Sequence, residues 1–181
     1  MSALALAIVL PACRREPAAV PRRTAYARVA VLDSAAEPVP DFPLYFPLSR
    51  SARVSLPRPL WLDVAYPDYG ATAHITLTLA DGEALDRVKA NRLERLMLNA
   101  GDRPGRRSEW LTPAGYDVLT LYTDGSATPW QFVATDDSSA VLSGAVYFAD
   151  PAAVANADSL APMVDAIAAD ITAALNAMRP L

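Results

Sequence analysis

The sequence contains a single cysteine, Cys13, and a single histidine, His74, among its 181 residues. One cysteine excludes an internal disulfide bond. Zinc sites need several histidine and cysteine ligands at short spacing, and the sequence has no such set. The neighbouring carboxylates of Asp136 and Asp137 do not belong to an EF-hand calcium loop. We therefore expect the protein to hold neither a metal ion nor another cofactor.

Recognisable catalytic motifs are also missing. The sequence has no G-x-S-x-G elbow and no glycine-rich phosphate loop. A Ser–His–Asp set could use only His74 as its base, and His74 shares one face of a strand-like segment with three threonines. That setting is typical of a half-buried, hydrogen-bonded histidine. We expect the protein not to be an enzyme, and the weakest alternative is a hydrolase with His74 in a cleft beside a serine and an acid.

Basic residues are fewer than acidic ones, so the formal net charge is −4 and the pI is about 4.9. This balance argues against a nucleic acid as partner, because affinity for phosphates comes mainly from cations. The arginines near the N-terminus are Arg14, Arg15, Arg22, Arg23 and Arg28. They indicate either a solvated tether or a segment beside anionic lipid head groups.

The sequence opens on a short apolar run rather than a membrane span. Residues 3–10 (ALALAIVL) are far fewer than the roughly 20 that cross a bilayer, but they suit the core of a signal peptide. Residues 10–13 (LPAC) resemble the lipobox of bacterial lipoproteins, although Pro11 stands where Ala or Ser is usual. The other interpretation is an apolar first strand or helix with an incidental cysteine. We predict a signal peptide (1–12), a lipidated Cys13 with its tether (13–24), and one α+β domain (25–181).

Hydrophobic periodicity predicts an antiparallel sheet with two amphipathic helices. Strands are expected at 26–32, 60–66, 71–79, 116–122, 129–135 and 140–148, with a hairpin joining 60–66 to 71–79 and a meander of the last three. Prolines in 38–59 predict short extended pieces and turns, and 102–115 reads as a polar loop. Helices are expected at 83–99 and 159–178. The expected apolar positions of the first are Leu85, Val88, Leu93, Leu96 and Met97.

Aromatic residues gather between positions 42 and 69, and most of them should lie in the core. Part of this cluster could form a patch that binds a partner, because aromatic side chains are enriched at interface centres. The candidate interaction surface consists of Trp61, Tyr69, His74, Gln131 and Asp136.

Three stretches in register resemble the gliding motility lipoprotein GldD family. They are residues 61–77 (WLDVAYPDYGATAHITL), 128–148 (TPWQFVATDDSSAVLSGAVYF) and 156–162 (NADSLAP). His74 and Ile75 stand in swapped order relative to the family pattern, and Ser143 stands where the family often has arginine. The likeness covers most of residues 21–178. In addition, the order of elements is similar to that of the PsbP/Mog1 type of α/β/α sandwich.

The family resemblance implies an envelope lipoprotein needed for gliding and linked to the type IX secretion machinery. It implies no enzymatic activity. On this basis we expect a non-enzymatic accessory or scaffold protein, anchored by lipid and facing the periplasm, with envelope proteins of that machinery as partners. Arg14 after Cys13 does not resemble an inner-membrane retention signal, which slightly favours the outer membrane. The alternative is a periplasmic module that binds a small molecule or a lipid, which would need a roomy apolar pocket between helix and sheet.

Overall fold

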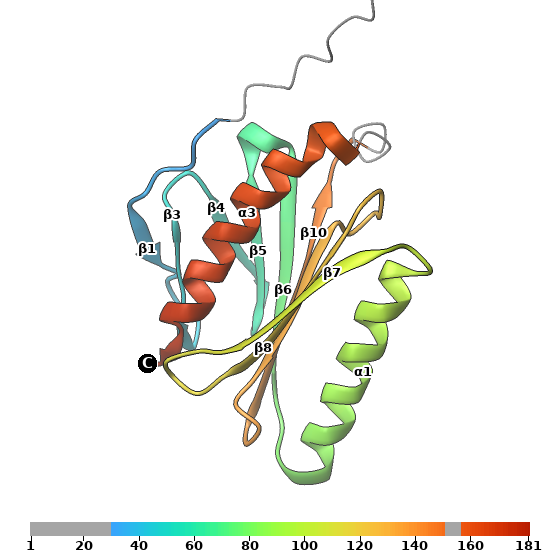
Figure 1. Cartoon of the computed structure of the whole chain (residues 1–181). Coiled ribbons are helices and arrows are strands. Elements are labelled where there is room, and N and C mark those ends of the chain that lie inside the picture. Colours follow the sequence, from blue (N-terminus) through green and yellow to red (C-terminus); the bar gives the residue numbers. More distant parts are fainter. Residues whose placement is uncertain (1–29, 151–156) are drawn as a thin grey trace, which may run out of the picture.

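The computed structural model describes residues 30–150 and 157–181, and its centre is a seven-stranded antiparallel sheet (Figure 1). The strand order is β4-β5-β6-β10-β9-β8-β7. The bounds are β4 Arg53–Arg58, β5 Trp61–Tyr66, β6 Ala71–Leu79, β7 Gly105–Leu111, β8 Asp117–Thr123, β9 Trp130–Thr135 and β10 Ala140–Phe148. The helices in this part of the chain are α1 (Gly82–Ala100) and α3 (Ala157–Ala177). The predicted α+β class, an antiparallel sheet with two amphipathic helices, is confirmed.

The sheet order follows from two kinds of connection. Short turns join β5 to β6 and join β7 through β10 in sequence, so these strands pair with their chain neighbours. The α1 connection instead carries the chain from β6 to the far edge of the sheet, and the meander returns until β10 pairs with β6. Both the predicted hairpin and the predicted meander are therefore present. The pairing of β6 with β10 joins them into one sheet.

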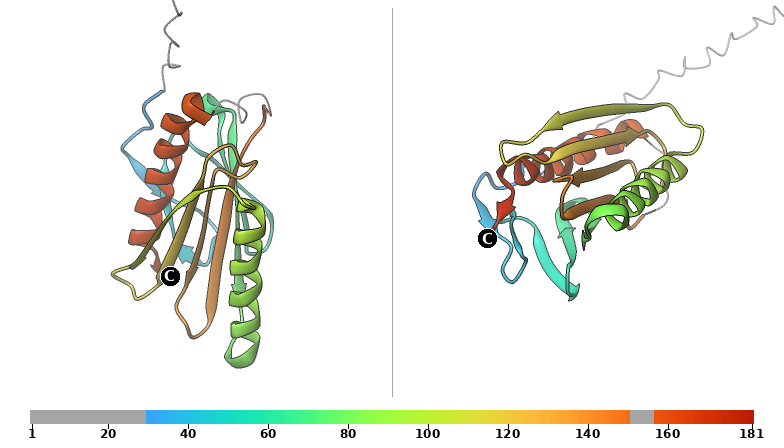
Figure 2. Two further views of the ribbon diagram at one scale, coloured as in Figure 1. Left: turned by 45° about the vertical axis from the view of Figure 1, so that its right-hand side comes forward. Right: turned by 90° about the horizontal axis from the view of Figure 1, so that it is seen from below.

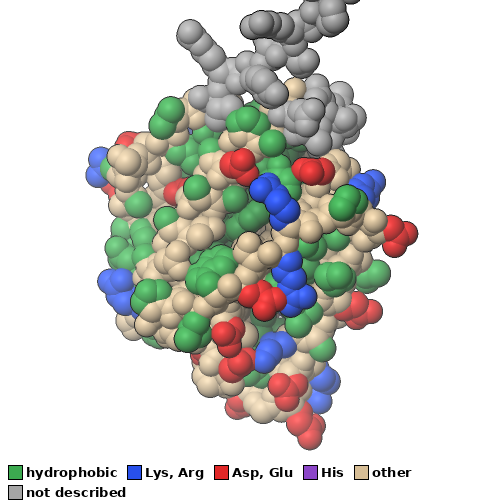
Figure 3. Space-filling model, in the orientation of Figure 1, with side chains coloured by type: hydrophobic (Ala, Val, Ile, Leu, Met, Phe, Trp, Pro, Cys, Tyr) green, Lys and Arg blue, Asp and Glu red, His purple; other side chains and the backbone are tan. Residues whose placement is uncertain are grey.

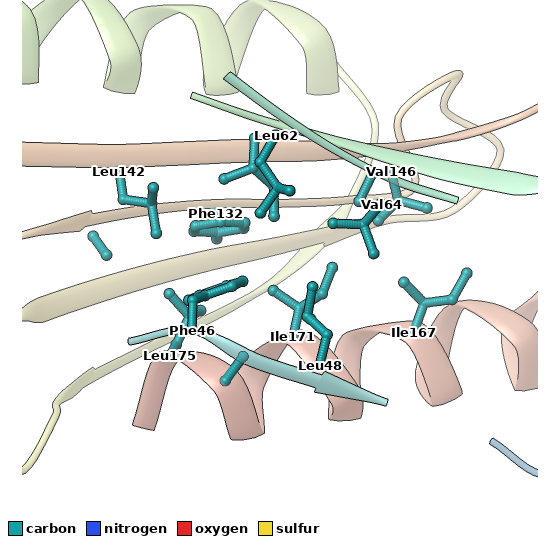
Figure 4. Close-up of a cluster of buried hydrophobic side chains, with 14 of the residues drawn as sticks. Phe46, Leu48, Leu62, Val64, Phe132, Leu142, Val146, Ile167, Ile171 and Leu175 are labelled. Carbon is teal, nitrogen blue, oxygen red and sulfur yellow. The ribbon is translucent and has the colours of Figure 1, made fainter. Parts of the chain in front are cut away.

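The main core lies between the sheet and α3. The stripe of α3 that faces the sheet consists of Leu160, Val164, Ile167, Ile171, Ala174 and Leu175, each no more than 4% exposed. Opposite this stripe, alternate residues of the strands are buried, and Figure 4 shows Phe132 among them with Leu62, Val64, Leu142 and Val146. Each fully buried aliphatic side chain stabilises the fold by about 1.5–3 kcal/mol. By length and composition, Ser159–Ala177 is also apolar enough to cross a membrane, but here its apolar stripe packs on the sheet.

A partly buried carboxylate ties α3 to β5 and to the N-terminal part of the domain. Asp170 accepts a hydrogen bond from the Tyr66 hydroxyl of β5 (2.8 Å) and another from the backbone N–H of Ser49 (3.0 Å). Burial raises the pKa of Asp170, and these two hydrogen bonds oppose that rise. Burial and the nearby charge of Asp170 also raise the pKa of Tyr66 far above its usual value.

The proline-rich N-terminal part packs around α3 as short strands. These are β1 (Ala36–Pro38), β2 (Leu44–Tyr45) and β3 (Pro47–Ser49); β1 pairs with β3, and β2 pairs with β11 (Arg179–Pro180) after α3. Phe46 and Leu48 from this part join the core against α3 (Figure 4). The expected short extended pieces are present, and Arg53–Arg58 also forms a full edge strand.

Two of the predicted elements are wrong. The expected loop at 102–115 contains β7, which pairs along its whole length with β8 and so forms the other edge of the sheet. Residues 30–32 of the expected strand 26–32 form no strand, and the rest of that segment lies outside the described residues. The predicted bounds of 71–79 and 140–148 are confirmed, and the other helix and strand bounds differ from expectation by no more than two residues. Residues 1–24, with the predicted signal peptide, Cys13 and tether, also lie outside the described part.

Candidate functional site on the open side of the sheet

The two faces of the sheet differ in how completely they are covered (Figure 2). On the α3 face the described side chains form a continuous core. On the other face α1 is held by a small cluster, in which Leu85, Leu96 and Ala100 meet apolar side chains of β8, β9 and β10. Two apolar positions predicted for the inner side of α1 are exposed instead, Leu93 by 39% and Met97 by 59%. The α1 face therefore keeps open surface on both flanks of the helix.

Polar contacts complete the attachment of α1. Asn99 donates from Nδ2 to Oε1 of Gln131 (2.9 Å), and Ser126 donates to the carbonyl of Asn99 (3.1 Å). Near the middle of the helix, Lys89 pairs with Asp137, a residue in the turn between β9 and β10. These contacts fix where the flanks of α1 lie over the sheet.

Four side chains from β5, β6 and β10 lie together on the α1 side of the sheet. We call this cluster the open face, and its residues are Trp61, Asp63, His74 and Tyr147. The register sets Asp63 opposite His74, and their Oδ1 and Nδ1 atoms are 2.7 Å apart. The His74 ring lies 5.4 Å from the Tyr147 ring, between centroids. Trp61 is 44% exposed, Tyr147 41%, and the His74 side chain 55%. Exposed aromatic rings beside a histidine that is hydrogen-bonded to a carboxylate can give a partner both apolar and polar contacts.

A hollow of about 150 Å³ lies between the open face and α1. We call it the basic hollow, and its polar lining consists of His74, Thr76, Arg92, Arg95, Asn99, Gln131 and Ser143. Arg92 donates from Nη2 to the Thr78 hydroxyl at 3.3 Å. Burial, and secondarily the neighbouring Arg95, lowers the pKa of Arg92.

A larger groove of about 410 Å³ runs along the other flank of α1, over β7, β8 and β9. Leu93, Leu111 and Leu119 supply apolar surface, and charged side chains such as Lys89, Arg107 and Glu109 line its rim. Figure 3, in the orientation of Figure 1, shows acidic and basic side chains interspersed over the lower right, where α1 lies, with hydrophobic side chains between them. The groove therefore combines an apolar wall with charges of both signs.

The five residues of the predicted interaction surface fall in different places. Trp61 and His74 lie on the open face, as expected of a surface. Gln131 is 3% exposed and holds α1 through Asn99, although it also lines the basic hollow. Tyr69 is 6% exposed, stacks on Tyr66 and donates its hydroxyl to the Ala30 carbonyl, so it is not a surface residue. Its burial corrects the expectation, because the short 3₁₀ turn η1 (Pro67–Tyr69) directs it into the core.

Asp136 organises a turn rather than a surface. Its Oδ1 accepts hydrogen bonds from the backbone N–H groups of Ser138, Ser139 and Ala140 (2.8–3.0 Å), and its Oδ2 accepts one from the Ser139 hydroxyl (2.6 Å). Burial alone would raise the pKa of Asp136, but these hydrogen bonds outweigh it and hold the pKa well below its usual value. The side chain is thus occupied by the β9–β10 connection.

Sequence reasoning missed Asp63, Tyr147, Arg92 and Arg95. Strand alternation places Tyr147 on the same side as Ser143, and an i, i+3 spacing places the two arginines on one flank of α1. The sequence therefore shows which side of its own strand or helix each residue occupies. It does not show that these residues lie near one another, because that depends on the pairing of β6 with β10.

The arrangement around His74 bears on catalysis. Asp63 orients the imidazole, and Ser143 lines the same hollow, yet in the described part of the chain His74 has no hydrogen bond to a serine hydroxyl. The described residues also contain no group of three or more His, Cys, Asp and Glu side chains that could hold a metal ion. The absence of enzymatic activity, of a metal and of a cofactor stays a prediction.

Taken together, the fold and the site define a layered α+β domain with a continuous core on the α3 side of the sheet and partly uncovered surface on the α1 side. Residues 16–179 match the model of the family described as gliding motility lipoprotein GldD. The chain therefore belongs to the GldD family, and the resemblance noted in the sequence is confirmed. As a lipoprotein of gliding motility, it is anchored to a membrane of the cell envelope. No curated protein and no solved structure matches the chain.

Proposed function

We propose that this lipoprotein is a non-enzymatic accessory or scaffold component of gliding motility and type IX protein secretion. It binds other envelope proteins of that machinery through the open face. The observation that supports this most directly is the exposure of Trp61 and Tyr147 on either side of the Asp63–His74 pair. Aromatic side chains are enriched where protein interfaces are most buried. We place the protein facing the periplasm, with the outer membrane slightly favoured.

The test is mass spectrometry of proteins that co-purify from membranes with a C-terminally tagged copy. Leu181 is 83% exposed, so a tag there does not disturb the core. The Trp61→Ala variant should lose secretion or motility components that the wild type recovers. Leu79→Ala is the matched control, because Leu79 is also exposed (60%) but lies outside the open face. Equal recovery by wild type and Trp61→Ala would contradict the proposal, as would a wild type that recovers none of these components.

The second candidate is a periplasmic module that binds a small molecule or a lipid. The groove beside α1 favours it, because about 410 Å³ falls within the usual range of ligand pockets, about 300–1,000 Å³. Organic extraction of the purified protein followed by mass spectrometry would detect a bound ligand. A ligand that is present in the wild type and reduced in Leu119→Trp, which fills the groove, would support this candidate. Identical extracts from the two proteins would exclude the groove as its site.

A further inference from the structure

The basic hollow is a concentration of positive charge without a matching carboxylate. Other cations of α1 are paired within the described residues, Arg87 with Glu83 and Lys89 with Asp137. Arg92 and Arg95 have no ion pair in the described part of the chain, and no Asp or Glu lines the hollow. Two like charges at i, i+3 repel each other, so their placement on one flank destabilises the helix slightly unless an anion lies between them.

Hydroxyl groups that can donate hydrogen bonds also line the hollow. The hydroxyls of Thr76 and Ser143 lie on the sheet side, on neighbouring strands at directly paired positions. The Oε1 atom of Gln131, which would repel an anion, is already occupied by Asn99. Guanidinium groups from the helix and hydroxyls from the sheet thus approach the hollow from two directions. A tetrahedral oxyanion can accept from both sides at once, because its oxygens point in several directions, whereas the two oxygens of a planar carboxylate lie in one plane.

We propose that the basic hollow binds a phosphate group, with Arg92 and Arg95 as its charged ligands and Thr76 and Ser143 as neutral donors. The hollow shares His74 with the open face, but its proposed phosphate ligands lie outside the open face. Arginine is favoured for such a role because its fork of N–H groups forms paired, charge-assisted hydrogen bonds to phosphate oxygens. The phosphate can belong to a soluble compound or to a lipid head group, since both present the same oxyanion.

Isothermal titration calorimetry of the full chain tests this proposal. The Cys13→Ala form, kept in a phosphate-free detergent, removes the lipid anchor as a variable. Inorganic phosphate is titrated at constant ionic strength, and acetate is the planar comparison. We expect phosphate to bind more tightly than acetate, and Arg92→Gln and Arg95→Gln each to weaken phosphate binding at least about tenfold.

Arg87→Gln is the matched control, because Arg87 lies on the same helix outside the hollow, and its phosphate affinity should equal that of the parent. Arg95 has no hydrogen bond within the described residues, so Arg95→Gln should fold normally, which circular dichroism checks. Short-chain phosphatidic acid that binds more tightly than inorganic phosphate would identify a lipid head group as the source, and weaker binding would identify a soluble phosphate. No measurable heat with about 10 mM phosphate, or equal affinities for the parent and Arg95→Gln, would overturn the proposal.

Discussion

At the scale of single residues, Gly144 is required by packing rather than by backbone conformation. A Cβ added there would lie 2.4 Å from Cε1 of Phe132 and 3.1 Å from Cγ1 of Ile75. Both neighbours belong to the core between the sheet and α3, and Figure 4 shows Phe132 between side chains of the sheet and of α3. Neither ring nor strand can move away without disturbing other buried side chains.

Gly144→Ala should therefore lower the free energy of unfolding by about 1–3 kcal/mol, the usual cost of overpacking a core. Chemical denaturation would measure the change. Ser143→Ala is the control, because Ser143 is next in sequence but points to the opposite face of β10 and should change stability by no more than about 0.5 kcal/mol. A Gly144→Ala protein as stable as the wild type would mean that the core around Phe132 is looser than it looks.

Asp136 provides a second prediction at this scale. Asp136→Ala removes the acceptor of four hydrogen bonds in one turn. It should lower the free energy of unfolding by about 2 kcal/mol near pH 7. Asp136→Asn should cost less, since its Oδ1 can still accept from the three backbone N–H groups. Urea denaturation of the three proteins would rank them. Equal losses in the two variants, which both lack the charge, would show that charge and not the turn geometry dominates.

The same residue predicts a pH dependence. Its folded-state pKa is depressed, so the folded state binds the Asp136 proton less readily than the unfolded state. The contribution is complete above the unfolded pKa, about 3.9, and is lost as the pH falls toward the folded pKa. The stability gap between wild type and Asp136→Asn should thus be constant from pH 7 to about pH 5 and shrink below about pH 4. A gap that widens on acidification would refute this assignment.

At the scale of elements, the two helices differ in how much of each is buried. The apolar stripe of α3 meets the sheet along the length of the helix, whereas α1 has three fully buried side chains, Leu85, Leu96 and Ala100. Long-range polar contacts support α1 at Lys89 and Asn99. Because local stability follows buried apolar contact, α1 should be the easier helix to open.

Leu96→Ala should lower the free energy of unfolding by about 2 kcal/mol, whereas Leu98→Ala should change it by less than about 0.5 kcal/mol. The two leucines lie on one helix but are 4% and 70% exposed, so they are matched in all but burial. Amide hydrogen exchange should show faster exchange in α1 than in α3, and faster still in Leu96→Ala. Equal protection of the two helices would show that the polar contacts of α1 compensate for its thin core.

At the scale of the whole molecule, the lipid anchor decides where the open face and the basic hollow can act. The predicted attachment site, Cys13, precedes the family match, which begins at residue 16. Cys13→Ala should abolish incorporation of labelled palmitate and move the protein out of the membrane fraction, because the residual apolar run is too short to span a bilayer.

Ala12→Ser is the matched control for that experiment, since it keeps a small residue before the cysteine and should leave labelling unchanged. Palmitate incorporation into Cys13→Ala would show that lipid is attached elsewhere. If Cys13→Ala carries no palmitate but remains at the membrane, a partner and not the lipid alone must hold the protein there.

Much of the fold could be predicted because local periodicity records which face of an element is apolar. The alternation along Ala71–Leu79 and the helical spacing of Leu160 through Leu175 both appear in the structure as predicted. β7 escaped prediction because its sequence, GRRSEWL, is polar. It is a strand by virtue of its hydrogen bonds to β8, and its side chains are almost all exposed. Leu93 and Met97 are the opposite case, because their helical spacing predicts burial but both are exposed. The spacing of apolar residues does not say how much of the sheet is available to cover them.

The sequence by itself determined the α+β class, the family, the hairpin and the meander. Only the tertiary structure decided that Tyr69 and Gln131 are buried, that Asp63 meets His74, and that Arg92 and Arg95 line one hollow with Thr76 and Ser143. The physical reason is the separation of the residues along the chain. The apolar pattern of one helix or strand involves residues only a few positions apart, so it can be seen directly in the sequence. The site arises where α1 carries the chain across the sheet and β10 returns beside β6, and those neighbours are set by the path of the whole chain.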